Sequence, residues 1–318
     1  MLLSCGDALI DFLPVKSADG RDAIVPVAGG SCLNIAVGMA RLGVQAGFVG
    51  GIANDMLGRI VAEHAQASDV GLEYTTRSDH QCTLAFVRSV AGEPQYAFYD
   101  EGSAAQNWIY RSGSIPFGEV DAIHVGSTTL VSDAGATQAL AVVREAKGSA
   151  TVSFDPNCRP NLVKDKGGYL ARMAEFAAAA DIIRMSDVDF EYLYGNDDYA
   201  GRAASMLDAG ASLVVITQGI KGVQAWHGKA GVLQVETPKV EVVDTIGAGD
   251  SFQAALLFAL YTLGRINTET LRKIHAVELR RALSFATACA AITCGRVGAD
   301  PPWLGDITTE KNKLLRGT

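Results

Sequence analysis

The sequence predicts an α/β fold, in which a central, mostly parallel sheet carries helices on both faces and a small β-sheet projects as a lid. Strand-like apolar runs alternate with amphipathic helical runs along most of the 318 residues, and this rhythm is typical of a parallel sheet covered by helices. The rhythm breaks at residues 12–30 and 76–117, where TLAFVRSV and PQYAFYDE flank a short turn with no helix between them. Such a pair is typical of a β-hairpin, so the two segments are expected to form a small antiparallel sheet.

The predicted elements follow one another in a regular order. Three strand-like runs are each followed by an expected helix: GFVGGI by a helix from about Leu57, AIHVG by DAGATQALAVVREA, and ATVSFD by YLARMAEFAAAA. Two more strand-like runs follow, DIIRMS and LVVIT. A late hairpin, GVQAWHG with AGVLQVETP, is expected to extend the main sheet, KVEVV to add a strand, and Ala276 to Ala291 to form the last long helix. No repeat or low-complexity linker interrupts the chain. Residues 1–318 are therefore predicted to form one domain, with 12–30 and 76–117 inserted as lid segments.

Composition and charge exclude several functional classes. Hydrophobic residues make up 48% and charged residues 19% of the chain, as in ordinary folded proteins. The formal charge of −8 and the lack of a basic cluster disfavour nucleic acid. The N-terminal run MLLSCGDALIDFLP has no basic leader, and no apolar run approaches the ~20 residues that span a membrane. Six cysteines without paired short spacings are expected to be free thiols, so a cytoplasmic protein that binds neither nucleic acid nor membranes is predicted.

The stretch DTIGAGDSF precedes a strongly apolar helix and carries the clearest chemical signal. It is not a P-loop, and Phe252 stands where a dinucleotide fingerprint has its third glycine. Gly247, Ala248 and Gly249 let a ligand approach the backbone amides of a helix N-terminus, which suits a transferring phosphoryl group. Asp250 could accept the proton of an attacking hydroxyl. An aspartate before an apolar helix is also a common N-cap, and these nine residues leave both interpretations open.

A second glycine-rich stretch, AGGSCLNIAVGMARLG, lies near the N-terminus. Gly29 and Gly30 allow close backbone approach, and the amide of Asn34 on the first helical turn can both donate to and accept from a polyol. An ordinary turn before an amphipathic helix is the alternative. Asp55, at the start of the next helix, is predicted to be a local cap.

A polar loop, FDPNCRPNL, follows a predicted buried strand. Asp155, Asn157 and Arg159 alternate there with two prolines, at the carboxyl end of a strand where open α/β sheets bind their ligands. A structural turn is the alternative.

Together these stretches resemble one family. AGGSCLN and DTIGAGDSF look like the two signatures of the PfkB/ribokinase family of carbohydrate kinases, in the expected order, and the resemblance covers nearly the whole chain. FDPNCRP, CGRVGADPP and YAFYDEGSA are similar to the fructokinase and 2-keto-3-deoxygluconate kinase branch. The resemblance implies a ribokinase-like fold and phosphorylation of a small sugar, most of all fructose, by ATP with Mg²⁺. The alternatives are 2-keto-3-deoxygluconate or another sugar as substrate, and a non-catalytic sugar or adenylate sensor.

The resemblance also implies roles for single residues. Asp250 would be the general base, with the amides of residues 247–250 as the anion hole. The implied sugar-binding residues are Asp11, Gly29, Gly30 and Asn34, with Arg88 and Arg159 as candidate partners of a substrate carboxylate. The implied nucleotide-binding residues are Asn157, Ser186, Thr217, Gly219 and Gly222.

Cation sites and assembly are implied less directly. Where the family commonly has N-x-x-E, this chain has Ser186-Asp187-Val188-Asp189, so Asp189 would hold Mg²⁺ through water. The loop residues implied for a K⁺ site are Asp244, Ile246, Thr293 and Gly298. The apolar lid strands leave a homodimer open, because exposed strand edges invite pairing.

Overall fold

A ten-stranded sheet forms the centre of the computed structural model, which describes residues 1–90, 93–195 and 197–316, without the side chains of residues 87–96. The strand order is β14-β13-β12-β11-β10-β9-β1-β4-β5, and β6 pairs with β4. Neighbouring strands are parallel from β12 to β5, whereas β13 and β14 extend the sheet as the predicted antiparallel hairpin. The strands are β1 (Leu2–Cys5), β4 (Ala46–Ala53), β5 (Val70–Gly71), β6 (Thr75–Ser78), β9 (Ala122–Gly126), β10 (Thr151–Asp155), β11 (Ile182–Ser186), β12 (Leu213–Thr217), β13 (Val223–His227) and β14 (Gly231–Val235).

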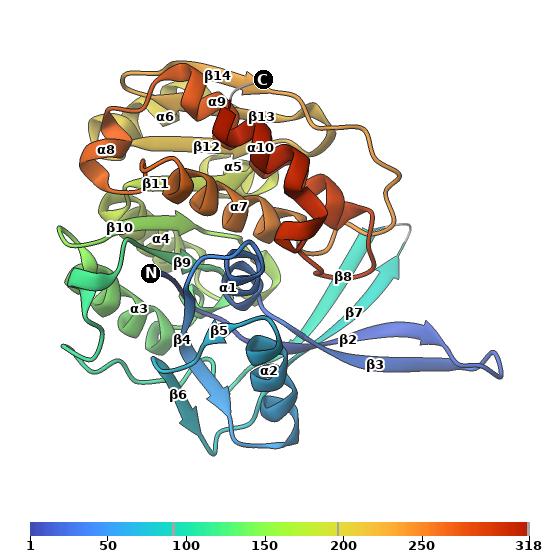
Figure 1. Cartoon of the computed structure of the whole chain (residues 1–318). Helices are drawn as coiled ribbons and strands as arrows, with labels where there is room; N and C mark the ends of the chain where they lie inside the picture. Colours follow the sequence, from blue (N-terminus) through green and yellow to red (C-terminus); the bar gives the residue numbers. More distant parts are fainter. Residues whose placement is uncertain (91–92, 196, 317–318) are drawn as a thin grey trace.

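Helices cover both faces of this sheet, as the alternating sequence pattern predicts (Figure 1). One hydrophobic cluster packs Leu2 of β1 against one set of helices, and a second packs Leu3 against the other set, because successive strand residues point to opposite faces. The first set is α1 (Ser31–Arg41), α2 (Met56–Ala67), α7 (Ala248–Thr262), α9 (Ala276–Cys294) and α10 (Thr308–Arg316). The second set is α3 (Asp133–Ala146), α4 (Lys166–Ala179), α5 (Asp187–Tyr194) and α6 (Tyr199–Asp208), and the short α8 (Thr268–Arg272) precedes α9.

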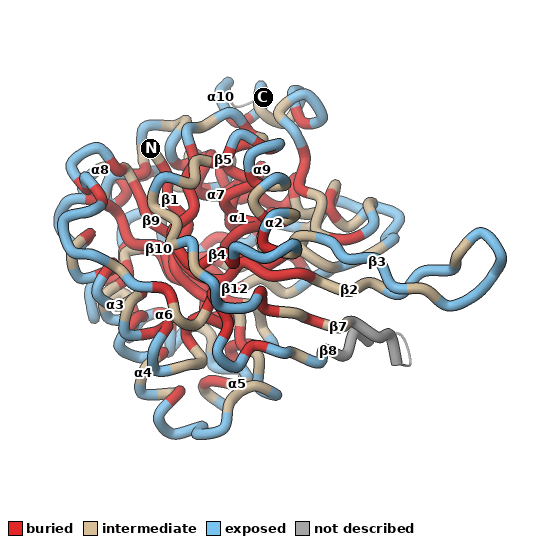
Figure 2. The backbone as a smooth tube through the Cα atoms, turned by 90° about the horizontal axis from the view of Figure 1, so that it is seen from below, coloured by how far each residue is buried: buried red, intermediate tan, exposed pale blue. Residues whose placement is uncertain are grey.

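The lid is a separate four-stranded sheet in the order β3-β2-β7-β8, which projects from the main body (Figures 1 and 2). Its strands are β2 (Leu9–Lys16), β3 (Asp22–Gly29), β7 (Thr83–Val90) and β8 (Glu93–Tyr99). Each hairpin is antiparallel as expected, but β2 and β7 run parallel, with Asp11 opposite Ala85. The expectation of an antiparallel sheet is therefore wrong at this join, because the first strands of both hairpins lie side by side.

The lid strands also have other bounds than the predicted segments, and the second hairpin is shorter than residues 76–117. Residues 75–78 form β6, which pairs with β4 of the main sheet, and residues 100–117 contain no strand in the part of the chain that is described. The first hairpin begins earlier than expected, at Leu9.

The predicted strand KVEVV is wrong. The described residues 239–243 form no strand, and the side chains of Val240, Val242 and Val243 are 41%, 56% and 57% exposed. The backbone N–H groups of Val243 and Asp244 instead donate to the carbonyl oxygen of Cys294, at the end of α9. An apolar run becomes a strand only where it pairs with a neighbouring strand, and residues 239–243 take part in none of the described strand pairings.

Two further expectations concern the chain as a whole. All six cysteines are free, and five of them are buried, as predicted. None of the described helices combines the length and the apolar character needed to cross a membrane.

Candidate active site

Helix α7 begins in the glycine turn of DTIGAGDSF without a capping side chain. Its N-cap is Gly247, at φ 75°, a left-handed backbone conformation that favours glycine. Helices α2 to α6 are all capped by a side chain, from Asp55, Ser132, Asp165, Ser186 and Asp198 respectively. Asp55 is thus the local cap that the sequence predicts. The uncapped start of α7 leaves amide donors and the positive end of the helix dipole for an anionic ligand.

Asp250 is not an N-cap. It lies in the first turn of α7, where Ser31 Oγ donates to its Oδ1 at 2.7 Å and Asn34 Nδ2 donates to its Oδ2 at 2.9 Å. Burial raises the pKa of Asp250, the hydrogen bonds from Asn34 and Ser31 oppose that shift, and the Asp7 charge adds to it. A carboxylate with a raised pKa is a better proton acceptor near neutral pH.

A buried ion pair lies beneath this turn. Arg184 of β11 donates through Nη1 to Asp155 Oδ2 at 2.5 Å and through Nη2 to Thr217 Oγ1 at 2.6 Å. A Cβ on Gly249 would stand 3.0 and 3.1 Å from the same two nitrogens. The ends of β10, β11 and β12 and the start of α7 are therefore joined through one guanidinium group.

Asp11 lies on the lid, close to the start of α1. A Cβ on Gly29 would overlap its carboxylate, so the glycine makes room for this side chain. Burial raises the pKa of Asp11 to about 7, the charges of Asp7 and Asp250 add to the shift, and Arg159 opposes it. The predicted sugar-binding carboxylate and the predicted base are thus within electrostatic reach of each other.

A cavity of about 730 Å³ opens between the end of the lid and the loop after β10. Phe98 and Leu162 are among the residues that line it. Asp11, Ala85 and Phe98 lie opposite one another across three lid strands, and opposed residues share one face of a sheet. Tyr99, the next residue of β8, also lines the cavity, and successive strand residues point to opposite faces, so the cavity lies at the end of the lid sheet.

The start of α1 is held by Asp7. Gly30 is the N-cap of α1, at φ 105°, and Asp7 Oδ1 accepts from the backbone N–H of Cys32 at 3.0 Å. Asp7 Oδ2 accepts from the hydroxyls of Ser127 and Thr128 at 2.9 and 3.1 Å. Asp7 thus takes the capping role at α1, while α7 stays uncapped.

The polar loop FDPNCRPNL reaches the same site. Asn157 Nδ2 donates to Ser31 Oγ at 2.7 Å, and Arg159 Nη1 donates to Asn157 Oδ1 at 2.6 Å. This loop is therefore linked to Asp250 through Ser31. Arg88 lies on β7, but its side chain is outside the described residues.

Apart from Asn157, the predicted nucleotide residues lie at the end of β11 and at and after the end of β12. Ser186 caps α5 in a capping box with Asp189, and Thr217 contacts Arg184. Gly219 begins a 3-10 turn, and a Cβ on Gly222 would overlap the carbonyl oxygen of Val235, so the β13–β14 hairpin alone accounts for that glycine.

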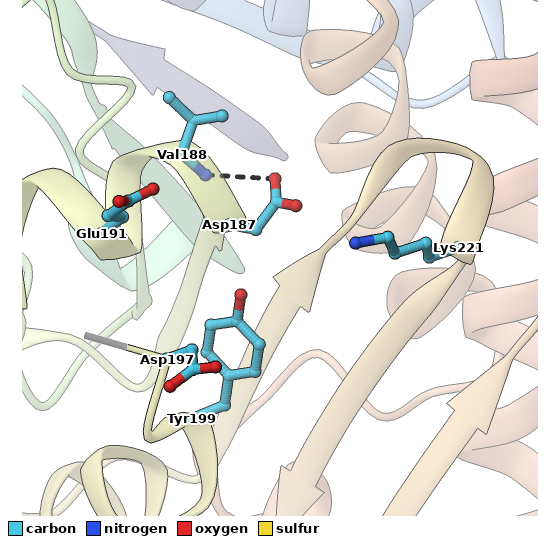
Figure 3. Close-up of a pocket in the computed structure, with 6 residues that line it drawn as sticks. All are labelled: Asp187, Val188, Glu191, Asp197, Tyr199 and Lys221. Carbon is cyan, nitrogen blue, oxygen red and sulfur yellow. Dashed lines mark hydrogen bonds between the residues drawn. The ribbon is translucent and has the colours of Figure 1, made fainter.

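A pocket of about 410 Å³ lies beside this turn (Figure 3). Lys221 and Asp187 point toward one another across it, and the Asp187 carboxylate accepts from the N–H of Val188 at 3.1 Å. The other lining residues are Glu191, Asp197 and Tyr199. None of the predicted site residues lines this pocket, although Lys221 stands between Gly219 and Gly222.

The loop implied for a monovalent cation meets the expected C-terminal loop. Asp244 Oδ1 accepts from the N–H of Ile246 at 3.0 Å, and its Oδ2 accepts from the N–H of Gly298 at 2.9 Å. Thr293 is buried, and its hydroxyl donates to the carbonyl oxygen of Cys289. The structure thus brings three of the four predicted residues directly together.

Asp189 has a different surrounding. Its carboxylate accepts from the N–H of Cys158 at 2.8 Å and from the hydroxyl of Ser186 at 2.7 Å. Burial, and next the charge of Asp155, raise the pKa of Asp189. Within the described ranges, no group of three or more His, Cys, Asp or Glu side chains could hold a metal ion.

Sequence reasoning missed Ser31, Arg184 and Asp7. Ser31 stands inside the motif AGGSCLN, between the glycines and Asn34. Arg184 is the charged residue in the otherwise apolar strand DIIRMS, and a buried cation always needs a partner. That signal was present in the sequence.

These contacts define what the site can do. A carboxylate with fixed donors, an uncapped helix N-terminus and a lid face with a second carboxylate lie together at the carboxyl ends of parallel strands. Such an arrangement can take a proton from a bound hydroxyl while backbone amides hold an anion.

Known proteins are similar to this chain in both sequence and fold. The model of the pfkB family carbohydrate kinases matches residues 1–304. A fructokinase from Rhizobium leguminosarum bv. trifolii is 40% identical over 263 residues, which cover 82% of this chain and 79% of the relative. A solved fructokinase with bound ATP from Xylella fastidiosa has a TM-score of 0.86 at 25% identity, over 99% of both chains. A fructokinase from Vibrio cholerae O395, in its fructose, ADP and calcium ion bound form, has a TM-score of 0.80 at 25% identity, over 94% of both chains. The ribokinase-like fold and the resemblance predicted from the sequence are therefore confirmed, and the chain belongs to the pfkB family of carbohydrate kinases.

Proposed function

We propose that this sugar kinase is a fructokinase, which transfers the γ-phosphoryl group of ATP to a hydroxyl of fructose with Asp250 as the general base. The observation that carries the proposal is the position of Asp250. Its carboxylate is held by two donors from α1 at the uncapped start of α7, where a phosphoryl group and a sugar hydroxyl can both be reached.

The remaining roles follow from the same geometry. The amides of residues 247–250 would stabilise the charge on the transferring phosphoryl group. Asp11, Gly29, Gly30 and Asn34 would bind the sugar beneath the lid. The turn after β12, with Thr217, Gly219 and Gly222, would border the nucleotide.

Mg²⁺ fits the chain as a cofactor that is held mainly by phosphates and water. Mg²⁺ commonly takes only one or two protein carboxylates, and Asp189 lies close enough to Asp155 for their charges to interact. Asp189 would hold the ion through water, and the ion would neutralise charge on the phosphates.

The engagement of Arg159 favours a neutral sugar over 2-keto-3-deoxygluconate. Of the charged groups that act on Asp11, Asp7 and Asp250 raise its pKa and Arg159 lowers it. Arg159 Nη1 is also engaged by two carbonyl oxygens of its own loop and by Asn157 Oδ1. Arg159 is therefore already occupied within its own loop, whereas the hydroxyls of fructose suit carboxylate acceptors.

Three further features belong to the same proposal. A monovalent cation such as K⁺ would bind near Asp244 and raise the activity. The exposed edge strand β3 would join two copies of the chain through their lids. The protein would act in the cytoplasm, where its free thiols stay reduced.

The test is ADP release with ATP and Mg²⁺ from a panel that contains fructose, 2-keto-3-deoxygluconate, ribose, glucose and adenosine. Fructose is expected to give the highest kcat/KM. Asp250→Asn should lower kcat on fructose by about 10³-fold, while binding of fructose and ATP, measured by calorimetry, persists. Turnover by Asp250→Asn close to that of the unchanged protein would overturn the assignment of the base. Turnover on 2-keto-3-deoxygluconate alone would overturn the choice of sugar.

A further inference from the structure

We propose that Ser31 is a positioning residue for the proton-accepting carboxylate of Asp250. Ser31 is the last donor in a chain of hydrogen bonds in which Arg159 donates to Asn157, Asn157 donates to Ser31 and Ser31 donates to Asp250. This inference rests on the proposed role of Asp250 as the base. Ser31 itself does not exchange a proton with the substrate in this proposal. It holds the carboxylate in one orientation.

Arg159 sets the direction of the chain. A guanidinium group only donates hydrogen bonds, so the atom of Asn157 that lies 2.6 Å from Arg159 Nη1 must be the oxygen, Oδ1. The amide nitrogen of Asn157 then faces Ser31, 2.7 Å from its Oγ. The hydrogen-bond partners of Asn157 thus determine which way its side-chain amide is oriented.

The same reasoning fixes the proton of Ser31. A hydroxyl carries one proton, and an amide nitrogen can only donate. Because Asn157 Nδ2 donates to Ser31 Oγ, the hydroxyl proton is directed to Asp250 Oδ1, at 2.7 Å. Without Asn157, the hydroxyl could rotate away from the carboxylate.

Both oxygens of Asp250 consequently have a fixed donor. Ser31 donates a hydrogen bond to Oδ1 and Asn34 donates one to Oδ2, and both donors come from the first turns of α1. Asp7 anchors that part of α1 through the N–H groups of Cys32 and Leu33. Two donors on a fixed helix set the plane of the carboxylate, so its remaining lone pairs face the site in one direction.

The chain also favours the ionised carboxylate. A hydrogen bond donated to a carboxylate stabilises its charged form, so Ser31 holds down the pKa of Asp250 against the effect of burial. The charged groups that act on Asp250 are Asp7 from the β1–β2 connection, Asp11 from the lid, Arg159 from the loop after β10 and Arg184 from β11.

The central experiment compares Ser31→Ala with Ser4→Ala. Ser4 is a matched control, because it is a buried serine of β1 whose Oγ donates to the carbonyl oxygen of Cys32 in the same helix turn, at 2.7 Å. Both variants lose one hydroxyl beside the start of α1, but only Ser31→Ala removes a donor from Asp250. Any general loosening of α1 should affect both variants equally.

Ser31→Ala is expected to lower kcat about 10- to 100-fold, the usual effect of one hydrogen bond to a charged group. KM for ATP should change less than threefold. The acidic limb of the pH profile of kcat should move upward by about one unit, because the base loses a donor that favours its ionised form. Ser4→Ala should keep kcat within threefold and leave the pH profile in place, and Ser31→Thr, which keeps the hydroxyl, should restore both.

A double-mutant cycle tests the link to Asn157. If Asn157 acts on the base through Ser31, the loss of kcat in Asn157→Ala combined with Ser31→Ala should be smaller than the product of the single losses. Fully independent losses, or equal losses in Ser31→Ala and Ser4→Ala with no change of the pH profile, would overturn the proposal. Asp250→Asn distinguishes this proposal from the proposed function. An active Asp250→Asn variant would refute Asp250 as the base. An inactive Asp250→Asn variant together with an unaffected Ser31→Ala variant would refute only the role of Ser31.

Discussion

The guanidinium group of Arg184 lies directly beneath Gly249, so that Nη1 and Nη2 stand 3.0 and 3.1 Å from the place where a Cβ on residue 249 would be. The same nitrogens bind Asp155 and Thr217 at 2.5 and 2.6 Å. The proposed anion hole and the buried ion pair are therefore one packed unit. A substitution in the anion hole should therefore alter the ion pair, and a substitution in the ion pair should alter the anion hole.

Gly249→Ala is expected to shift the start of α7, because its new methyl group would press on the guanidinium group of Arg184, which Asp155 and Thr217 hold. Overpacking of this kind costs about 1–3 kcal/mol, so both kcat and the melting temperature should fall. Gly118→Ala is the control, since no atom lies within 4 Å of its added Cβ. A Gly249→Ala variant as active and as stable as Gly118→Ala would contradict this prediction.

Arg184→Met should lower the free energy of unfolding by about 3–5 kcal/mol, because it leaves the buried carboxylate of Asp155 without its cation. Arg265→Met removes a more exposed ion pair with Glu278, at 2.8 Å, and should cost about 1 kcal/mol or less. Urea unfolding followed by circular dichroism measures both. The side chains of the first pair are 7% and 3% exposed, and those of the second 29% and 19%. Adding Asp155→Asn to Arg184→Met should recover part of the loss, and equal losses in the two single variants would refute the argument from burial.

Asp11→Asn should stabilise the protein increasingly as the pH rises. The pKa of Asp11 is raised from 3.8 to about 7 by burial and by the charges of Asp7 and Asp250. Between these two values the unfolded chain ionises while the folded chain keeps its proton, so ionisation costs the folded protein stability as the pH rises toward 7. The gain in melting temperature on replacing Asp11 should therefore grow from pH 5 to pH 7 and then level off. A gain that does not depend on pH would exclude this origin.

Ile24→Lys should change the oligomeric state if two lids pair through β3. Ile24, Val25 and Val27 are 54%, 45% and 37% exposed on this edge strand, and a lysine on an exposed edge opposes strand pairing. Light scattering after size-exclusion chromatography is expected to give the mass of a dimer for the unchanged chain and of a monomer for the variant. A monomer of 33.4 kDa in both samples would remove the lid dimer from the proposal.

Replacing sodium by potassium at constant ionic strength should raise kcat, because the loop of Asp244 is joined to the start of the proposed anion hole by the N–H of Ile246. Asp244→Asn should reduce the response, since it lowers the negative charge between that loop and Gly298. Initial rates in KCl, NaCl and choline chloride measure the effect. Identical rates in all three salts would show that no such cation is needed.

Much of the fold could be predicted from the sequence, because hydrophobic periodicity is a local property. The alternating strands and helices and the late hairpin β13–β14 are found where the pattern indicates them. KVEVV shows the limit of such reasoning. Its β-like composition is real, but a strand also needs a partner edge, and the chain leaves Val240, Val242 and Val243 exposed instead.

For the candidate site, too, some features follow from the local sequence and others only from the tertiary structure. The sequence by itself determined the family, the glycine turn that leaves α7 uncapped and the aspartate in its first turn, since these depend on residues that are neighbours in the chain. Only the tertiary structure decided what surrounds Asp250, because Ser31 and Asn34 lie 219 and 216 positions away along the chain. Contacts between such distant residues arise from the packing of α1 against α7 and of β10 beside β11, and no local pattern records which polar side chains that packing brings within hydrogen-bonding distance.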